Sequence, residues 1–285
     1  MKLSLANRAS EIYVPDGAPP EAALARTTHL GIGAHPDDLE FMALHGILAC
    51  YGRADAWFAG VTCTDGGGSA RTGPYADYSD EQMKAVRQRE QRTAAAIGQY
   101  GALLQLGYTS REAKDARDGR LEADLAAILA AARPRVVYTH NPADKHATHV
   151  AVMCRALAAL RRLPDDQLPE AVYGCESWRG LDWLPDARKT LLDCTGRENL
   201  HAALMGVYDS QISGGKRYDL AVSGRLRANA TLLESHAADR ATALLFAMDL
   251  TPLVRDRKRD PAEYVLGLID EFKAQVREAL AQAGA

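Results

Sequence analysis

The stretch His29-Leu-Gly-Ile-Gly-Ala-His-Pro-Asp-Asp-Leu-Glu40 decides the fold of this 285-residue chain. After His29, residues 30–34 are apolar or small, so 29–34 is typical of a short buried strand. Residues 39–51 have the spacing of a helix. The polar residues 35–38 therefore follow directly after a strand. In open α/β sheets, ligands bind at this edge, outside the carboxyl ends of the strands.

Strand-like runs and helical patterns alternate along the rest of the chain. The expected strands are 56–63, 102–106, 136–139, 172–175 and 190–192, and the expected helices are 79–98, 121–134, 150–162, 198–207 and 217–236. A last helix carries an apolar stripe of Val265, Ile269, Phe272, Val276 and Leu280. This alternation predicts an α/β, Rossmann-like fold, with a mostly parallel sheet flanked by helices. We expect one domain over residues 1–285, with the catalytic motifs within 28–165 and the C-terminal half packed on the sheet.

Composition narrows the function classes. Hydrophobic residues make up 47% of the chain, and the net charge of −3 favours neither nucleic acid nor an anionic membrane as partner. No run approaches the roughly 18 apolar residues of a membrane span. Five cysteines, odd in number and widely spaced, indicate a reducing compartment, and we expect a cytoplasmic protein.

The segment at residues 35–40 has the residue types of a metal site. His35 and Asp38 are three residues apart across a strand-to-helix turn, so both can point to one spot as zinc ligands. Asp37 would then lie beside the metal as a general base, and Glu40 could support a ligand from behind. The alternative is that an aspartate only caps the following helix.

A second polar cluster follows the expected strand 136–139. It contains His140, Asp144, His146 and His149, and the last two share a face if they lie on a helical turn. One histidine would complete the metal site, and another would stabilise an oxyanion and protonate a leaving amine. A solvated polar loop is the alternative interpretation.

These motifs resemble the PIG-L/LmbE-like family of zinc-dependent N-acetylglucosaminyl de-N-acetylases. Ala34 to Glu40 matches the family's A-H-P-D-D-x-E motif at every fixed position, and residues 146–149 correspond to its H-P-D-H motif. The resemblance implies zinc ligands His35, Asp38 and His149, the general base Asp37, and His146 as acid or oxyanion stabiliser. It also implies substrate contacts from the R-x-x-E motif, which is Arg87 to Glu90 here.

One position departs from the family pattern. Thr148 stands where the family has an aspartate before the last histidine. That aspartate is expected to orient the catalytic histidine, so its partner here is open, and Asp144 is the candidate substitute.

Two further residues could form walls of the pocket. Asp65 opens a glycine-rich loop after the second strand, and Trp178 could stack on a sugar face. The function expected is removal of an acetyl group from an N-acetylated sugar, of the N-acetylglucosamine type, or its conjugate. The rivals are a zinc amidohydrolase for a non-sugar amide or secondary metabolite, and a non-catalytic ligand-binding relative. One Zn²⁺ per chain is expected, although Fe²⁺ also fits such ligands. The partner would be a small acetylated molecule, and a homo-oligomer is left open.

Overall fold

One sheet runs through the whole molecule. The computed structural model describes residues 3–284, and its eight strands pair in the order β1-β4-β3-β2-β5-β6-β8-β7. The strands are β1 (Glu11–Tyr13), β2 (His29–Gly33), β3 (Phe58–Thr64), β4 (Ala102–Tyr108), β5 (Val136–His140), β6 (Ala171–Cys175), β7 (Lys189–Asp193) and β8 (Leu244–Asp249). The central strands β4, β3, β2, β5 and β6 are parallel, whereas β1, β8 and β7 join antiparallel. The predicted α/β class with a mostly parallel sheet is confirmed.

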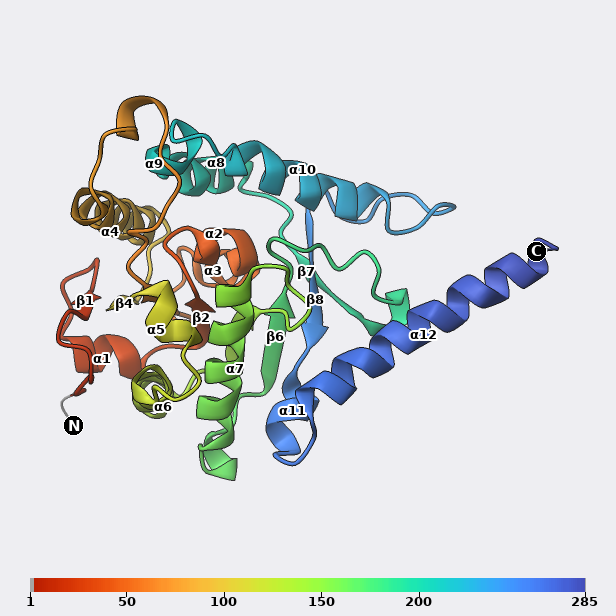
Figure 1. Cartoon of the computed structure of the whole chain (residues 1–285), viewed down its shortest axis with the longest axis horizontal. Coiled ribbons are helices and arrows are strands. Elements are labelled where there is room, and N and C mark those ends of the chain that lie inside the picture. Colours follow the sequence, from red (N-terminus) through yellow and green to blue (C-terminus); the bar gives the residue numbers. More distant parts are fainter. Residues whose placement is uncertain (1–2, 285) are drawn as a thin grey trace.

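Helices cover both faces of the sheet (Figure 1). One layer contains α1 (Pro20–Ala25), α5 (Ser110–Lys114), α6 (Arg120–Ala132), α7 (Ala147–Arg161), α11 (Thr251–Arg255) and the start of α12 (Pro261–Gln282). The other contains α2 (Asp38–Met42), α3 (Leu44–Cys50), α4 (Asp80–Ile97), α8 (Glu198–Gly206), α9 (Asp209–Ile212) and α10 (Tyr218–Thr231). Short 3-10 turns lie at Gly73–Tyr75, Asp165–Gln167 and Asp186–Arg188. Each layer buries its own apolar cluster against one face of the sheet.

The strand order changes direction between β2 and β5. From β2 the chain moves outward through β3 and β4, and it then returns to place β5 on the other side of β2. A crevice forms at such a switch point because the loops that follow the two strands leave in opposite directions. The two polar clusters that the sequence places after these strands therefore meet there.

Two glycines of β2 let the following helix come close to the sheet. A Cβ atom on Gly31 would lie 2.8–2.9 Å from Phe58 and Leu39 side chains, and one on Gly33 would lie 3.0 Å from the Cβ of Asp38. Larger residues would push α2 outward. These glycines thus set the position of Asp38 and have a packing role.

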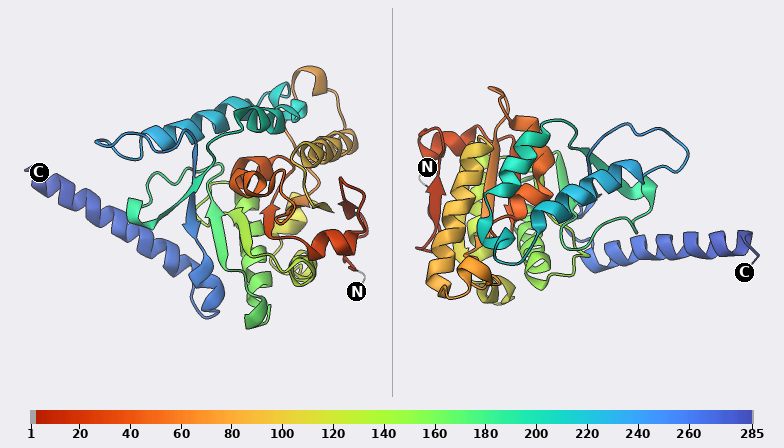
Figure 2. Two further views of the ribbon diagram at one scale, coloured as in Figure 1. Left: turned by 180° about the vertical axis from the view of Figure 1, so that it is seen from behind. Right: turned by 90° about the horizontal axis from the view of Figure 1, so that it is seen from above.

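Several elements differ from the sequence prediction. The expected helix 39–51 is divided at Ala43 into α2 and α3. No element was predicted before residue 29, but this segment contains β1, which pairs with β4, and α1. Strand β8 was not predicted either. Helix α12 packs on the body by its first turns only, through Val265 and Leu268. Figure 2 shows the rest of α12 extending away from the body. Along this part the stripe residues Ile269, Phe272, Val276 and Leu280 are exposed.

Residues 3–284 contain no helix that combines the length and the apolar character needed to cross a bilayer.

Candidate metal centre and active site

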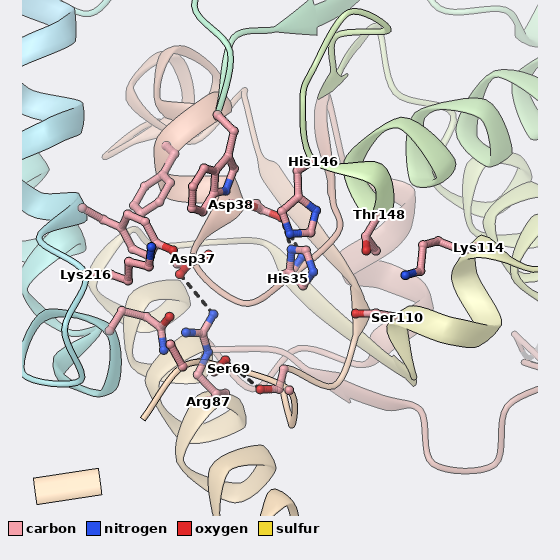
Figure 3. A pocket seen from close by; sticks show the side chains of 17 residues that line it. His35, Asp37, Asp38, Ser69, Arg87, Ser110, Lys114, His146, Thr148 and Lys216 are labelled. Atoms are coloured by element: carbon pink, nitrogen blue, oxygen red, sulfur yellow. Dashed lines mark hydrogen bonds and ion pairs between the residues drawn. The ribbon is translucent and has the colours of Figure 1, made fainter. Parts of the chain in front are cut away.

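A pocket opens at the switch point, at the carboxyl ends of β2 and β5. Figure 3 shows side chains from both halves of the chain pointing into it. His35, Asp37 and Asp38 come from the turn after β2, and His146 and Thr148 come from the start of α7. Trp178, Gln211, Lys216 and Tyr218 are contributed by the C-terminal half. The structure thus brings together both motifs predicted from the sequence.

The three predicted metal ligands converge. His35 Nδ1 lies 3.3 Å from Asp38 Oδ2, His149 Nε2 lies 3.4 Å from Asp38 Oδ1, and the two histidine nitrogens are 3.2 Å apart. Zinc–ligand distances of about 2.0–2.1 Å place the ligand atoms of a tetrahedral site roughly 3.3–3.4 Å apart. The two histidine nitrogens have about this separation, and each of them faces a different oxygen of Asp38, so the three side chains are placed to bind a small divalent cation.

Neighbouring histidines widen the set of candidate ligands. Two groups with suitable donor atoms share His149: one adds His35 and His146, and the other adds Asp38 and His140. His140 is fully buried and stacks on His149, with ring centroids 3.8 Å apart. Its Nε2 accepts the Ala34 N–H at 2.9 Å, so this lone pair is already engaged. His140 supports the ring of His149, a role that the sequence analysis did not assign.

The two aspartates have opposite electrostatic surroundings. Burial alone would raise the pKa of Asp38, but the adjacent His149 and His140 outweigh it and hold this pKa well below its ordinary value. For Asp37, burial dominates and raises the pKa to about 8, although the Arg87 guanidinium acts in the opposite direction. Asp38 is thus a permanent anion suited to a metal, whereas Asp37 can exchange a proton.

Asp37 is held by residues of α4. It has a left-handed backbone, with φ of 99°, and its N–H donates to Gln91 Oε1 at 3.0 Å. Its Oδ2 is 3.0 Å from Nη2 of Arg87, which also donates to the Pro36 carbonyl. Asp37 stands at the N-cap position of α2, yet its side chain makes no capping hydrogen bond. This geometry favours a functional role over the capping alternative.

Arg87 lies in the pocket wall with donors to spare. It is buried, and its Nε and Nη1 have no hydrogen-bond partner among residues 3–284. Such donors favour a polar ligand group at this wall.

Glu40 lies behind Asp37 and does not touch the metal ligands. It accepts hydrogen bonds from Tyr100 and Gln91 through Oε1, and from Tyr208 through Oε2 at 2.6 Å. Burial raises the pKa of Glu40 to about 7. Because Gln91 also holds the Asp37 backbone, Glu40 acts on the site through Gln91.

Asp144 supports His149 more directly than His146. Its Oδ2 lies 3.5 Å from His149 Nδ1, and its Oδ1 accepts only the backbone N–H of His146. Burial, followed by the charges of His149 and His35, lowers the pKa of His146 to about 4. The imidazole of His146 is therefore neutral near pH 7.

The other predicted pocket residues divide into two groups. Trp178 lines the pocket, with its ring 5.8 Å from that of His146 and 5.9 Å from that of Tyr218. Glu90 does not line it, because its carboxylate accepts the N–H and hydroxyl of Ser210 at 2.7 and 2.6 Å. Asp65 is also outside the lining and lies 3.2 Å from Lys84 Nζ.

Imidazole and carboxylate groups thus meet at the switch point of an α/β sheet, and they form a candidate metal-binding active site. Residues 30–160 match the family model described as PIG-L, GlcNAc-PI de-N-acetylase, so the resemblance drawn from the sequence is confirmed over this segment. A comparison with curated protein sequences finds no match.

Solved structures share the fold at low sequence identity. The conserved protein TT1542 from Thermus thermophilus aligns with a TM-score of 0.58 and 20% identity over 78% of this chain and 94% of that one. GalB, the 4-carboxy-2-hydroxymuconate hydratase from Pseudomonas putida, aligns with a TM-score of 0.58 and 16% identity over 79% of this chain and 96% of that one. N,N'-diacetylchitobiose deacetylase from Pyrococcus horikoshii aligns with a TM-score of 0.57 and 17% identity over 77% of this chain and 83% of that one. Because a hydratase and a deacetylase both share this fold, the reaction must be argued from the site.

Proposed function

We propose that this protein is a zinc-dependent hydrolase that removes the acetyl group from an N-acetylated sugar or its conjugate. The observation that carries the proposal is the convergence of His35, Asp38 and His149 within 3.2–3.4 Å of one another, beside Asp37 in an open pocket. The match of residues 30–160 to a family described as a de-N-acetylase supports the reaction type.

His35, Asp38 and His149 would hold the metal. A bound Zn²⁺ supplies Lewis acidity, which polarises an amide carbonyl and acidifies water. The protein fixes the ligands beforehand. Asp144 and His140 contact His149, and the backbone N–H of His35 donates to Asp38 Oδ2 at 2.6 Å. These contacts hold the two histidine nitrogens and the Asp38 carboxylate close together before a metal binds.

Asp37 would act as the general base. Its carboxylate takes a proton from the attacking water, and the pKa of about 8 lets it keep that proton near neutral pH. Arg87 keeps a fraction of Asp37 ionised and fixes the direction of its Oδ2. Asp37 and Arg87 together thus supply a base that has a fixed orientation and can both accept and release a proton.

His146 would face the reacting carbonyl. A neutral imidazole still carries one N–H, which can donate a hydrogen bond to a developing oxyanion. Negative charge on that oxygen would raise the pKa of His146, so that it could protonate the departing nitrogen. Acetate and a free amine would be the products.

The aromatic wall favours a ring-shaped substrate. Trp178 and Tyr218 stand nearly perpendicular, at 78°, and together with Phe41 they give the pocket an apolar corner. The C–H face of a pyranose would fit such a corner, and the polar opposite wall suits its hydroxyl groups.

The test is acetate release from N-acetylglucosamine and simple conjugates by metal-stripped protein, with and without added Zn²⁺ or Fe²⁺. Release that needs the metal and is lost in Asp37→Ala is expected. Release from non-sugar acetamides alone would move the substrate to the rival class. Ligand binding without release from any substrate would favour the non-catalytic rival.

The cytoplasmic location stays a prediction.

A further inference from the structure

One wall of the pocket carries polar groups that the proposed reaction does not use. Ser110 and Lys114 of α5 and Thr148 of α7 all line the pocket. In Figure 3 they lie close together beyond His35 and His146, on the side opposite Asp37 and Lys216. Residues 110–114 follow β4, so a third strand end contributes to the site.

These groups have no partners within the protein. Among residues 3–284, no hydrogen bond or ion pair engages Ser110 Oγ, Thr148 Oγ1 or Lys114 Nζ. Thr148 is nevertheless 98% buried, being 2% exposed. Because Thr148 lines the pocket, its free hydroxyl is available to a ligand bound there.

The charge of the wall is positive. Among the described residues, the acidic side chains that line the pocket are Asp37 and Asp38, and both are already compensated, by Arg87 and by His149. Lys216, across the pocket, lies over the Trp178 ring at 5.3 Å. Lys114 is therefore the cation of the pocket with neither a carboxylate nor an aromatic partner among the described residues.

We propose that Ser110, Lys114 and Thr148 form a subsite for an oxyanion, and that the acetylated substrate carries a phosphate or carboxylate group. This inference rests on the proposed function, because it places the acetamido group at the metal ligands and the anionic group beyond them. An ammonium and two hydroxyls supply several donors, which suits a group with several acceptor oxygens.

The residue at position 148 is consistent with this subsite. The sequence pattern of the resembling family has an aspartate there, whose charge would neutralise Lys114 and repel an anion. Threonine removes that charge and adds a donor. Thr148 and Lys114 thus both favour an anionic group in the subsite.

The experiment compares kcat/KM for N-acetylglucosamine, its 1-phosphate, its 6-phosphate and a carboxylated N-acetylhexosamine, all with Zn²⁺. We expect at least one anionic sugar to exceed the neutral sugar by about tenfold or more, as a charge-assisted contact allows. Lys114→Ala should remove that preference and leave the neutral sugar unchanged. Lys216→Ala is the matched control, because it removes the same charge from the opposite wall.

The outcomes separate this inference from the proposed function. An equal loss in Lys114→Ala and Lys216→Ala, or no preference for any anionic sugar, would overturn the subsite while deacetylation stands. If no substrate is hydrolysed, equilibrium binding of inorganic phosphate to the metal-stripped protein decides. Binding lost in Lys114→Ala and in Thr148→Asp keeps the subsite, and absence of binding to the unchanged protein overturns it.

Discussion

Replacing Arg87 by methionine should move the acidic limb of the pH–rate profile to higher pH. Asp37 must be ionised to accept a proton, and the guanidinium at 3.0 Å stabilises that ionised form. Removing the positive charge raises the pKa of Asp37, so a higher pH is needed before the base becomes available. Methionine fills much of the space of the arginine stem, and the change is mainly one of charge.

The size of the shift follows from the geometry. An arginine beside an aspartate lowers its pKa by about 1–3 units, and each unit corresponds to about 1.4 kcal/mol. Both side chains are nearly inaccessible, at 2% and 6% exposure, so solvent screens the pair little. We therefore expect the limb to move by about 1–3 pH units, with kcat/KM below the limb reduced about 10-fold to 1,000-fold.

The assay is acetate release from about pH 5 to pH 11, at a fixed zinc concentration, because a pKa of about 8 raised by about 1–3 units lies between about 9 and 11. Arg87→Lys keeps the charge and should return the limb part of the way. Arg89→Met removes an exposed arginine from the same helix and should leave the profile in place. If a folded Arg87→Met protein has the acidic limb of the unchanged enzyme, Asp37 is not the group that titrates.

Three further predictions follow from the site. Chelation should abolish activity and lower the melting temperature, and added zinc should restore both. His35→Ala should bind less than one equivalent of zinc, and full zinc occupancy in that variant would contradict the ligand assignment. His146→Gln should lower kcat about 100-fold or more with zinc content unchanged, and loss of the metal instead would make His146 a ligand. Tyr208→Phe should destabilise the fold by about 1–3 kcal/mol in urea unfolding, because a buried Glu40 loses a donor at 2.6 Å; an unchanged midpoint would refute this estimate of the bond.

The parts of the site that the sequence predicted are contiguous in the chain. His35 to Glu40 and His146 to His149 each lie within six residues, and each follows an apolar run that is typical of a strand. Local pattern therefore placed both motifs at strand ends, and the crossing of the chain from β4 back to β5 brought them together. The fold class and the pairing of the two motifs could be read this way.

The supporting contacts could not be predicted because they join distant segments. Tyr208 reaches Glu40 across 168 positions, and Ser210 takes the carboxylate of Glu90 across 120. No local periodicity encodes such pairs. The contact with Ser210 explains why Glu90 is turned away from the pocket, and no local pattern in the sequence indicates that contact.

The change at Thr148 has a consequence for how the two histidines divide their roles. Asp144 lies nearest to Nδ1 of His149, so the opposite nitrogen, Nε2, faces His35 and Asp38. Nδ1 is buried without a hydrogen-bond partner in both His146 and His149 among the described residues, but only His149 has a carboxylate within 3.5 Å of it. A fixed tautomer suits a metal ligand, whereas an imidazole without a fixed partner can gain or lose a proton at low cost in hydrogen bonds. This difference in carboxylate distance supports our proposal that His149 binds the metal and that His146 transfers the proton.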